Sequence, residues 1–172
     1  MNSVSRQSLP GRFDRKRSFF RDEQLPRLSE VLDGTSQQPW DLAAFETFLD
    51  ANFCGEILQF TTEVASYKWY FDVKKRCNTP KSDNDSQSTL KIIFEKILQT
   101  FIMQNAPQEI NIPGDVRDSI LALQDSEEAP DPSEFDVACN MMYDLMAGIF
   151  VQFLKRRPSS DRLSLPEARI PR

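Results

Sequence analysis

The feature that most constrains the fold is a wide apolar stripe between residues 90 and 102. Seven apolar side chains recur there at i, i+3, i+4, i+7, i+8, i+11 and i+12: Leu90, Ile93, Phe94, Ile97, Leu98, Phe101 and Ile102. This spacing places all of them on one face of an α-helix. A face this wide is typical of core packing, so we interpret the stripe as the inner side of a helix in a packed domain.

The same periodicity predicts helices along most of the chain, and no segment has a convincing strand pattern. Residues 79–88 and 126–130 are polar and contain proline, which predicts exposed connections. Gly148 is expected to bend the chain before a last short helix. Besides the stripe, the predicted helices cover residues 25–32, 41–49, 56–76, 115–125, 131–146 and 150–154. The predicted fold class is therefore all-α, a compact bundle of about eight or nine helices.

The chain of 172 residues carries a net charge of −5 that is distributed unevenly. Residues 1–21 hold six basic side chains and one acid, and residues 155–172 hold six basic side chains and two acids, which leaves −14 for the region between them. We expect a basic, disordered tail over residues 1–21, one helical domain over residues 22–157 and a second basic, disordered tail over residues 158–172. The acidic body argues against nucleic-acid binding by the fold itself.

The residue types that usually carry catalysis and metal binding are scarce. The chain has no histidine, the commonest general acid or base near neutral pH, and its five glycines form no phosphate-binding loop. Its three cysteines, Cys54, Cys77 and Cys139, have neither metal-ligand spacing nor a disulfide pattern. We therefore expect no catalytic residue, no metal and no cofactor. We also expect neither a signal peptide nor a membrane span, and we place the chain in the cytoplasm as a monomer.

A short turn at residues 109–114 is the strongest candidate for a functional site. Ile110 and Ile112 flank Asn111 there, so the two isoleucines can turn inward while the asparagine points outward. A short amide held in this way can donate and accept hydrogen bonds at once, and scaffolded loops often carry function. The alternative is that Asn111 caps its own loop in an Asx turn.

Six short pieces of the chain occur in an order that resembles a known family. They are Phe45-x-x-Phe48-Leu49, then Glu56, Phe60 and Tyr67-Lys68, then Glu109-Ile110-Asn111, then Phe135-Asp136-x-Ala138, Leu145-Met146 and Phe153-Leu154-Lys155. Together they resemble the RGS domain, the regulator of G-protein signalling, over about residues 28–156. No single piece is specific, but six in this order are. The chain is most similar to the divergent fungal type, in which the usual Glu-Asn-Leu signature is altered.

The resemblance implies an RGS fold and a role in G-protein signalling. RGS domains bind the GTP-bound α subunit of heterotrimeric G proteins, Gα, and accelerate its hydrolysis of GTP without adding a catalytic residue. The resemblance implies that Asn111 inserts among the switch segments of Gα. The positions that match the family's binding surface are Phe53, Cys54, Glu56, Ile57, Asn111, Arg117, Leu145, Ile149 and Gln152.

Four of these positions depart from the family's pattern. Ile57, Cys54 and Gln152 stand in place of the usual asparagine, serine and arginine, and Gly148 and Ile149 stand where an aspartate is usual, with one residue missing. These changes leave open an RGS-like scaffold that binds a protein or membrane partner without accelerating hydrolysis, and an unrelated helical adaptor is a third hypothesis. Glu56 and Leu145 also have structural interpretations, as a residue favoured at a helix start and as core. We expect Ile57→Asn to raise activity on Gα, unless Ile57 belongs to the core.

The basic tails suggest further contacts. Residues 13–20 combine three phenylalanines with Arg15-Lys16-Arg17, a composition that can attach weakly to an anionic membrane. Ser18 and Ser159 follow basic residues and resemble the sites of basophilic kinases. We therefore expect peripheral, reversible association with the inner face of the plasma membrane, which phosphorylation releases. The alternative is that both tails only keep the chain in solution.

Overall fold

The computed structural model describes residues 25–77 and 83–156 of the chain. In these ranges the chain forms helices and loops and no strand. The elements, in chain order, are α1 (Leu28–Leu32), α2 (Leu42–Ala51), α3 (Gly55–Cys77), α4 (Asp83–Ile97), the π-helical turn η1 (Leu98–Ile102), α5 (Gly114–Leu121), the 3-10 turn η2 (Pro132–Phe135) and α6 (Asp136–Lys155). The all-α prediction is confirmed, with six α-helices and the two short helical turns η1 and η2 in the described ranges.

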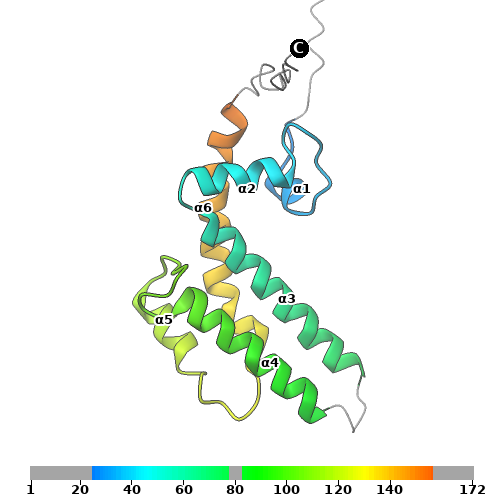
Figure 1. The fold of residues 1–172 in the computed structure, drawn as a ribbon, viewed down its shortest axis with the longest axis vertical. Helices are drawn as coiled ribbons and strands as arrows, with labels where there is room; N and C mark the ends of the chain where they lie inside the picture. Colours follow the sequence, from blue (N-terminus) through cyan, green and yellow to red (C-terminus); the bar gives the residue numbers. More distant parts are fainter. Residues whose placement is uncertain (1–24, 78–82, 157–172) are drawn as a thin grey trace, which may run out of the picture.

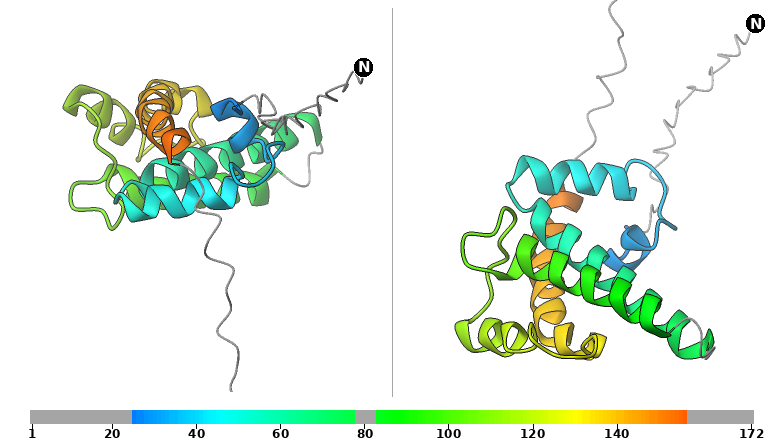
Figure 2. Two further views of the ribbon diagram at one scale, coloured as in Figure 1. Left: turned by 90° about the horizontal axis from the view of Figure 1, so that it is seen from above. Right: turned by 60° about the horizontal axis from the view of Figure 1, so that its bottom comes forward.

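Two long helices and one crossing helix form the body of the bundle. α3 and α4 run antiparallel side by side, and α6 crosses them (Figure 1). α2 lies across the end where α3 begins and α6 finishes, and α5 lies next to η1 (Figure 2). This arrangement brings the α2–α3 corner and the loop that follows η1 to the same side of the molecule (Figure 1).

The core is built from aromatic rings that join helices distant in the sequence. Phe60, Phe101 and Phe135 are buried and pack edge to face, with ring centroids 5.7 and 6.1 Å from that of Phe60. Phe45 packs in the same way on Phe150 at 5.4 Å and so joins α2 to α6. Each such pair contributes about 0.5–1.5 kcal/mol beyond its burial. The stripe over residues 90–102 is confirmed as core, because only its Ile93 is not fully buried.

The last turn of that stripe is wider than an α-helix. Residues 98–102 form the π-helical turn η1, which leads directly into the loop over residues 103–113. The carbonyls of Thr100 and Phe101 accept hydrogen bonds from the backbone N–H groups of Gln108 and Ile110, at 3.0 and 2.9 Å. The turn therefore fastens the loop to the core, and π-helical turns occur frequently beside functional sites.

The predicted connection over residues 79–88 is partly wrong. Its described part, residues 83–88, already belongs to α4, which begins at Asp83. The polar composition that suggested a loop is therefore also compatible with the start of a helix.

The predicted bend at Gly148 is wrong as well, because α6 continues unbroken to Lys155. A glycine inside a helix costs about 0.5–1 kcal/mol. Phe150 and Phe153 pack on Phe45 of α2 with ring centroids 5.4 and 5.2 Å away, and this packing outweighs that cost. The predicted last helix is thus the end of α6.

α6 is also unusually apolar for a helix of a bundle. Within Pro132–Lys155, an 18-residue window has a mean hydropathy of 1.4, so this stretch is long and apolar enough to cross a membrane by length and composition alone. The sequence pattern did not predict such a segment, because Asp144 and Gln152 interrupt its apolar residues. In the bundle its inward face supplies core residues: Ala138, Cys139, Met142, Met146, Phe150 and Phe153. Packing against α2 and α3 accounts for this inward face, whereas Val137, Leu145 and Val151 of the same helix are exposed.

Candidate functional site

An open hollow of about 380 Å³ lies between the α2–α3 corner and the loop over residues 103–113. Its lining comes from both segments, with Asp50, Phe53, Gly55, Glu56 and Gln59 on one side and Pro107, Gln108 and Glu109 on the other. The structure therefore brings two predicted contact residues, Phe53 and Glu56, to the same depression as the start of the predicted functional turn.

The corner between α2 and α3 is closed by short hydrogen bonds. The Phe53 N–H donates to the Asp50 carbonyl at 3.1 Å, and Asn52 Nδ2 donates to the Phe48 carbonyl at 2.6 Å. These bonds use carbonyls that the end of a helix leaves free. Phe53 itself has a left-handed backbone, with φ of 57°. This conformation costs a residue with a Cβ atom about 1–2 kcal/mol.

The side chain of Phe53 points away from the core and is 91% exposed. Neither burial nor backbone preference explains a phenylalanine at this position. Strained residues that are not glycine concentrate at binding sites, where the surrounding structure holds them in place. Phe53 is therefore a candidate anchor for a partner protein, as the sequence predicted.

α3 begins at Gly55, where the chain leaves little room. A Cβ atom at this position would collide with the Asp50 carboxylate unless that side chain turned away. The glycine thus allows the Asp50 carboxylate to lie beside the positive end of α3. Glu56 follows in the first turn, where the same partial charge favours it, and its half-buried side chain lines the hollow. The structural and the contact interpretation of Glu56 are therefore compatible.

The predicted geometry of the Asn111 turn is confirmed. Ile110 and Ile112 are 0% and 6% exposed, whereas Asn111 between them is exposed. Within the described residues, the Asn111 side chain forms no hydrogen bond, so the Asx-turn interpretation is wrong. The Asn111 amide, which can both donate and accept hydrogen bonds, is thus held pointing outward by the two buried isoleucines.

Arg117 of α5 clamps this loop from behind. Its Nη1 donates to Glu109 Oε1 at 2.5 Å and to the Ile102 carbonyl at 2.9 Å, and its Nη2 donates to the Ile110 carbonyl at 3.3 Å. Only 16% of the side chain is exposed. The prediction that Arg117 contacts a partner is therefore corrected, because its guanidinium is used inside the loop and positions Asn111 instead.

Glu109 completes the clamp, a role that the sequence did not predict. Its Oε2 accepts a hydrogen bond from the Asn105 N–H at 2.8 Å, while its Oε1 receives Arg117. The Asn105 hydrogen bond, and after it that of Arg117, hold the pKa of Glu109 below its usual value. Asn105 has a left-handed φ of 63°, which asparagine tolerates well. The sequence feature that could have predicted this role is the acidic Glu109 at the start of the turn, eight residues before the basic Arg117.

One predicted contact at the corner needs correction. Ile57 is 5% exposed and packs in the core with Phe60 and Val64, so its side chain is not offered to a partner. The helical spacing of these residues explains this burial. Cys54 is half-buried, and its Sγ donates to the Asn52 carbonyl at 3.3 Å, so its contact role stays a prediction. Burial, and to a lesser extent Glu56, raises the pKa of the Cys54 thiol, which disfavours a reactive thiolate.

Comparison with known proteins agrees with this geometry. Residues 32–157, most of the chain, match the family described as "Regulator of G protein signaling domain". The chain belongs to the RGS family. The resemblance drawn from the sequence is thereby confirmed, while a fungal character stays a prediction.

Individual relatives of this RGS chain come from animals and an amoeba. Regulator of G-protein signaling 5 from Sus scrofa is 31% identical over 129 residues, which are 72% of this chain and 62% of that protein. Regulator of G-protein signaling 8 from Mus musculus is 25% identical over 165 residues, 94% of this chain and 81% of that protein. Probable inactive serine/threonine-protein kinase roco10 from Dictyostelium discoideum is 24% identical over 127 residues, 74% of this chain but 4% of that protein.

On α6, this RGS domain exposes two of its three predicted contact residues. Leu145 is 46% exposed, so the interpretation of Leu145 as core is wrong, and Gln152 is also exposed. Ile149 is half-buried and packs against the core. The described lining of the hollow includes no residue of α6. A contact role of these three residues therefore stays a prediction. They lie on α6, which packs against α2 and α3, and both of those helices help to line the hollow.

Two further predictions lie outside the described residues. The basic tails over residues 1–21 and 158–172, with Ser18 and Ser159, are not among the residues that the structure describes. Membrane contact and phosphorylation therefore stay predictions. Within the described residues, no group of histidine, cysteine or acidic side chains is arranged to hold a metal ion.

Proposed function

We propose that this RGS domain binds GTP-loaded Gα through the hollow and the Asn111 turn, and that binding accelerates the hydrolysis of GTP by Gα. One observation carries the proposal: an exposed, unbonded Asn111 amide projects from a loop that Arg117 and Glu109 clamp. Family membership supports it further. We propose that the chain acts as a cytoplasmic monomer, in keeping with the free thiols of Cys54 and Cys139.

The proposed mechanism needs no catalytic group from this chain. Gα supplies its own arginine and the glutamine that orients the attacking water, yet alone it turns over at only about 10⁻² per second. A rigid amide inserted among the switch segments would hold that glutamine and the switches in the arrangement of the transition state. The gain comes from preorganisation, which the clamp has completed before binding.

The clamp also lowers the cost of association. A loop that must be ordered on binding loses conformational freedom, which reduces affinity by about 0.5–1.5 kcal/mol for each immobilised side chain. Here buried Ile110 and Ile112 and the Arg117 hydrogen bonds already fix the loop. Phe53 provides apolar contact area across the hollow. We infer that the two walls of the hollow divide the work, with Phe53 adding affinity and Asn111 adding acceleration.

A second candidate function is binding to a partner without acceleration. It is favoured by Ile57, which replaces a contact asparagine of the family and lies in the core, and by Gln152, which replaces an arginine. Both changes remove polar groups from the expected surface. A domain of this kind would still bind Gα or another protein through Phe53.

Single-turnover hydrolysis of GTP by a panel of Gα subunits separates the two functions. We expect the parent protein to accelerate at least one Gα, and Asn111→Ala to lose about 10- to 150-fold of that effect, since a hydrogen bond to a charged or desolvated group contributes about 1.5–3 kcal/mol. Stability should not change, because Asn111 is exposed. Asn140→Ala, at another exposed asparagine on α6, is the matched control.

The outcomes are distinct. Equal acceleration by the parent and Asn111→Ala contradicts the assigned role of Asn111. Binding to Gα without acceleration by the parent on any subunit supports the second candidate. Binding is measured with Gα held in a transition-state-like form by GDP and aluminium fluoride.

A further inference from the structure

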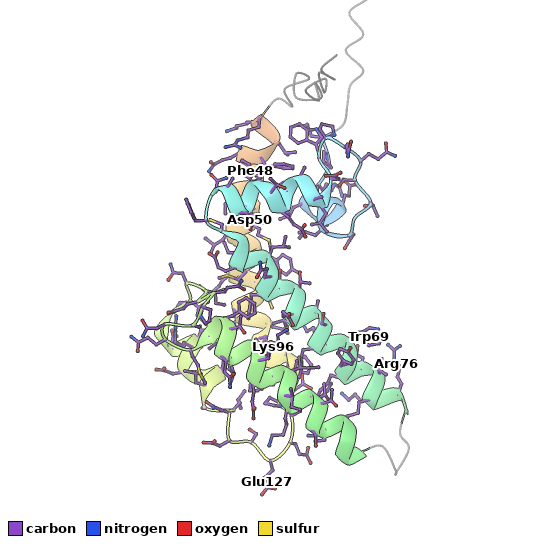
Figure 3. All side chains as sticks on the ribbon, in the orientation of Figure 1. Phe48, Asp50, Trp69, Arg76, Lys96 and Glu127 are labelled. Carbon is purple, nitrogen blue, oxygen red and sulfur yellow. The ribbon has the colours of Figure 1, made fainter. Side chains whose placement is uncertain are left out.

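A second depression adjoins the hollow and has a composition of its own. It is a groove of about 540 Å³ between α2, α3 and η1, and it shares Asp50, Gly55, Gln59 and Gln108 with the hollow. Figure 3 labels Asp50, where α2 meets α3, and Lys96, beside α3 further along the bundle. The groove has an apolar floor and an acidic rim, made respectively by Leu49, Leu58 and Phe101 and by Glu46, Asp50 and Glu63.

The rim leaves uncompensated negative charge around this floor. Among the charged side chains that line the groove, three are acidic and one, Lys96, is basic. Lys96 donates to Glu63 at 2.8 Å, so that pair is neutral as a unit. Glu46 and Asp50 are exposed and take part in no ion pair with other described residues. A ligand that fits must therefore offer both cationic groups and apolar surface.

The chain carries such a segment itself. Residues 12–21 contain five basic side chains, one acid and three phenylalanines. Residues 157–172, by contrast, hold four arginines against two acids and have no aromatic residue. We propose that residues 12–21 bind in the groove of the same molecule, with their basic side chains toward Glu46 and Asp50 and a phenylalanine over the apolar floor.

The reach of the chain permits this contact. The described residues begin at Leu25, and α1, three residues later, lies beside the start of α2 (Figure 1). α2 is ten residues long, or about 15 Å, and the groove adjoins its second half. Twelve residues separate position 13 from Leu25 and can span about 40 Å when extended. The segment can therefore pass along α2 to the groove.

Occupation of the groove has a consequence for the neighbouring hollow. Because the two depressions share lining residues, a bound segment would obstruct a partner at the corner. This consequence rests on the proposed function, whereas the docking itself does not. Ser18 lies inside the segment, and a phosphate there would add about −1.5 to −2 charges next to an acidic rim. Phosphorylation of Ser18 should therefore release the segment.

The docking is tested in the full chain without any G protein. A photo-crosslinking benzoyl-phenylalanine replaces Phe13, and mass spectrometry locates the crosslinks after irradiation. We expect crosslinks within one molecule, at a yield independent of protein concentration, to peptides that contain Glu46, Leu58 or Phe101. Glu46→Lys should lower this yield about threefold to tenfold, the range for losing a surface charge pair and placing like charges together. Glu95→Lys, at an exposed acid of α4 outside the groove lining, should not.

Several outcomes overturn the proposal. Crosslinks scattered over the surface, or a yield that Glu46→Lys leaves unchanged, show that the groove does not hold the segment. Crosslinked dimers assign the groove to a second copy of the chain. Absence of groove crosslinks together with co-sedimentation on anionic vesicles, lost when residues 1–21 are deleted, assigns the segment to a membrane. Confirmed docking in a chain that fails to accelerate any Gα would contradict only the proposed function.

Discussion

The two walls of the hollow are held in place by different physical means. The α2–α3 corner relies on a strained backbone at Phe53, a few local hydrogen bonds and the buried Ile57 behind it. The opposite loop relies on a polar clamp, in which Arg117 joins Glu109 to two backbone carbonyls. The corner thus gives up stability to expose an aromatic ring, whereas the loop uses long-range hydrogen bonds to hold a small amide still. Substitutions in the clamp of the loop should therefore lower both the stability of the fold and the acceleration of Gα. Loss of the Phe53 ring should instead weaken binding without lowering stability.

The largest effect is expected from Ile57→Asn, behind the corner. The substitution removes a buried apolar side chain and leaves an amide without a partner in the core, which together cost about 3–5 kcal/mol. This expectation replaces the gain of activity predicted from the sequence, because Ile57 is buried. Urea unfolding measures the loss. Ile92→Asn is the matched control, since Ile92 is 66% exposed and its replacement should stay within about 0.5 kcal/mol.

Arg117→Ala should break the clamp of the loop. It leaves the Ile102 and Ile110 carbonyls and the Glu109 carboxylate without their donor, at a cost of about 2–3 kcal/mol. Acceleration of Gα should fall as well, although Asn111 is untouched. Arg117→Lys keeps the charge but not the planar fork of the guanidinium, so its stability should lie between that of the parent and that of Arg117→Ala. Denaturant unfolding of these variants and of exposed Arg76→Ala tests the idea, and equal stability of all four proteins would refute the clamp.

Phe53→Gly, at the corner, should raise the stability of the fold, whereas the two preceding substitutions should lower it. Glycine adopts a left-handed backbone without strain, and after its larger entropy in the unfolded chain is counted, a gain of about 0.5–1 kcal/mol remains. Binding to Gα should weaken about tenfold, or ~1.4 kcal/mol, because the exposed ring is lost. Phe53→Ala keeps the strained backbone and loses only the ring. It should therefore bind as poorly as Phe53→Gly without becoming more stable; a lower melting temperature for Phe53→Gly than for Phe53→Ala would contradict the assignment of strain.

The smallest expected effect concerns pH. Hydrogen bonds from Asn105 and Arg117 hold the pKa of Glu109 below its ordinary value of 4.5 in the folded state. A lowered pKa means that the carboxylate stabilises the fold above the ordinary value and that this contribution disappears as the pH falls through the lowered one. The difference in melting temperature between the parent and Glu109→Gln should therefore be constant above about pH 5 and shrink toward pH 3. Parallel curves over this range would show that Glu109 does not titrate with folding.

Periodicity in the sequence was sufficient to predict most of the helices and the core. Ile57, Phe60 and Val64 have the spacing of one helix face and the structure buries all three, although the family resemblance placed Ile57 on the binding surface. The sequence pattern also predicted an outward Asn111 between two inward isoleucines. Both inferences concern residues whose environment follows from the local repeat of a helix or a turn.

The parts that the sequence did not predict depend on contacts between distant segments. Arg117 turns inward because three acceptors, two of them backbone carbonyls, meet at its guanidinium, and no local pattern reveals carbonyls. Gly148 does not bend α6, because rings of α2 hold the following turn. The exposure of Leu145 depends on which side of α6 the bundle covers. Each of these outcomes is decided by packing that exists only after the helices have assembled.

The π-helical turn η1 has a consequence for how this chain should be aligned with others. A π-helical turn is equivalent to one residue inserted into an α-helix. Removing one residue between positions 98 and 102 would restore α-helical geometry and rotate the following residues by about 100° relative to the preceding ones. An ungapped alignment across this turn with a chain that lacks the extra residue would then be shifted by one position. It would pair the functional asparagine of that chain with Ile110 or Ile112 instead of Asn111. Residue correspondences downstream of η1 should therefore be counted from Ile110, whose N–H donates to the Phe101 carbonyl and so ties the end of the loop to η1.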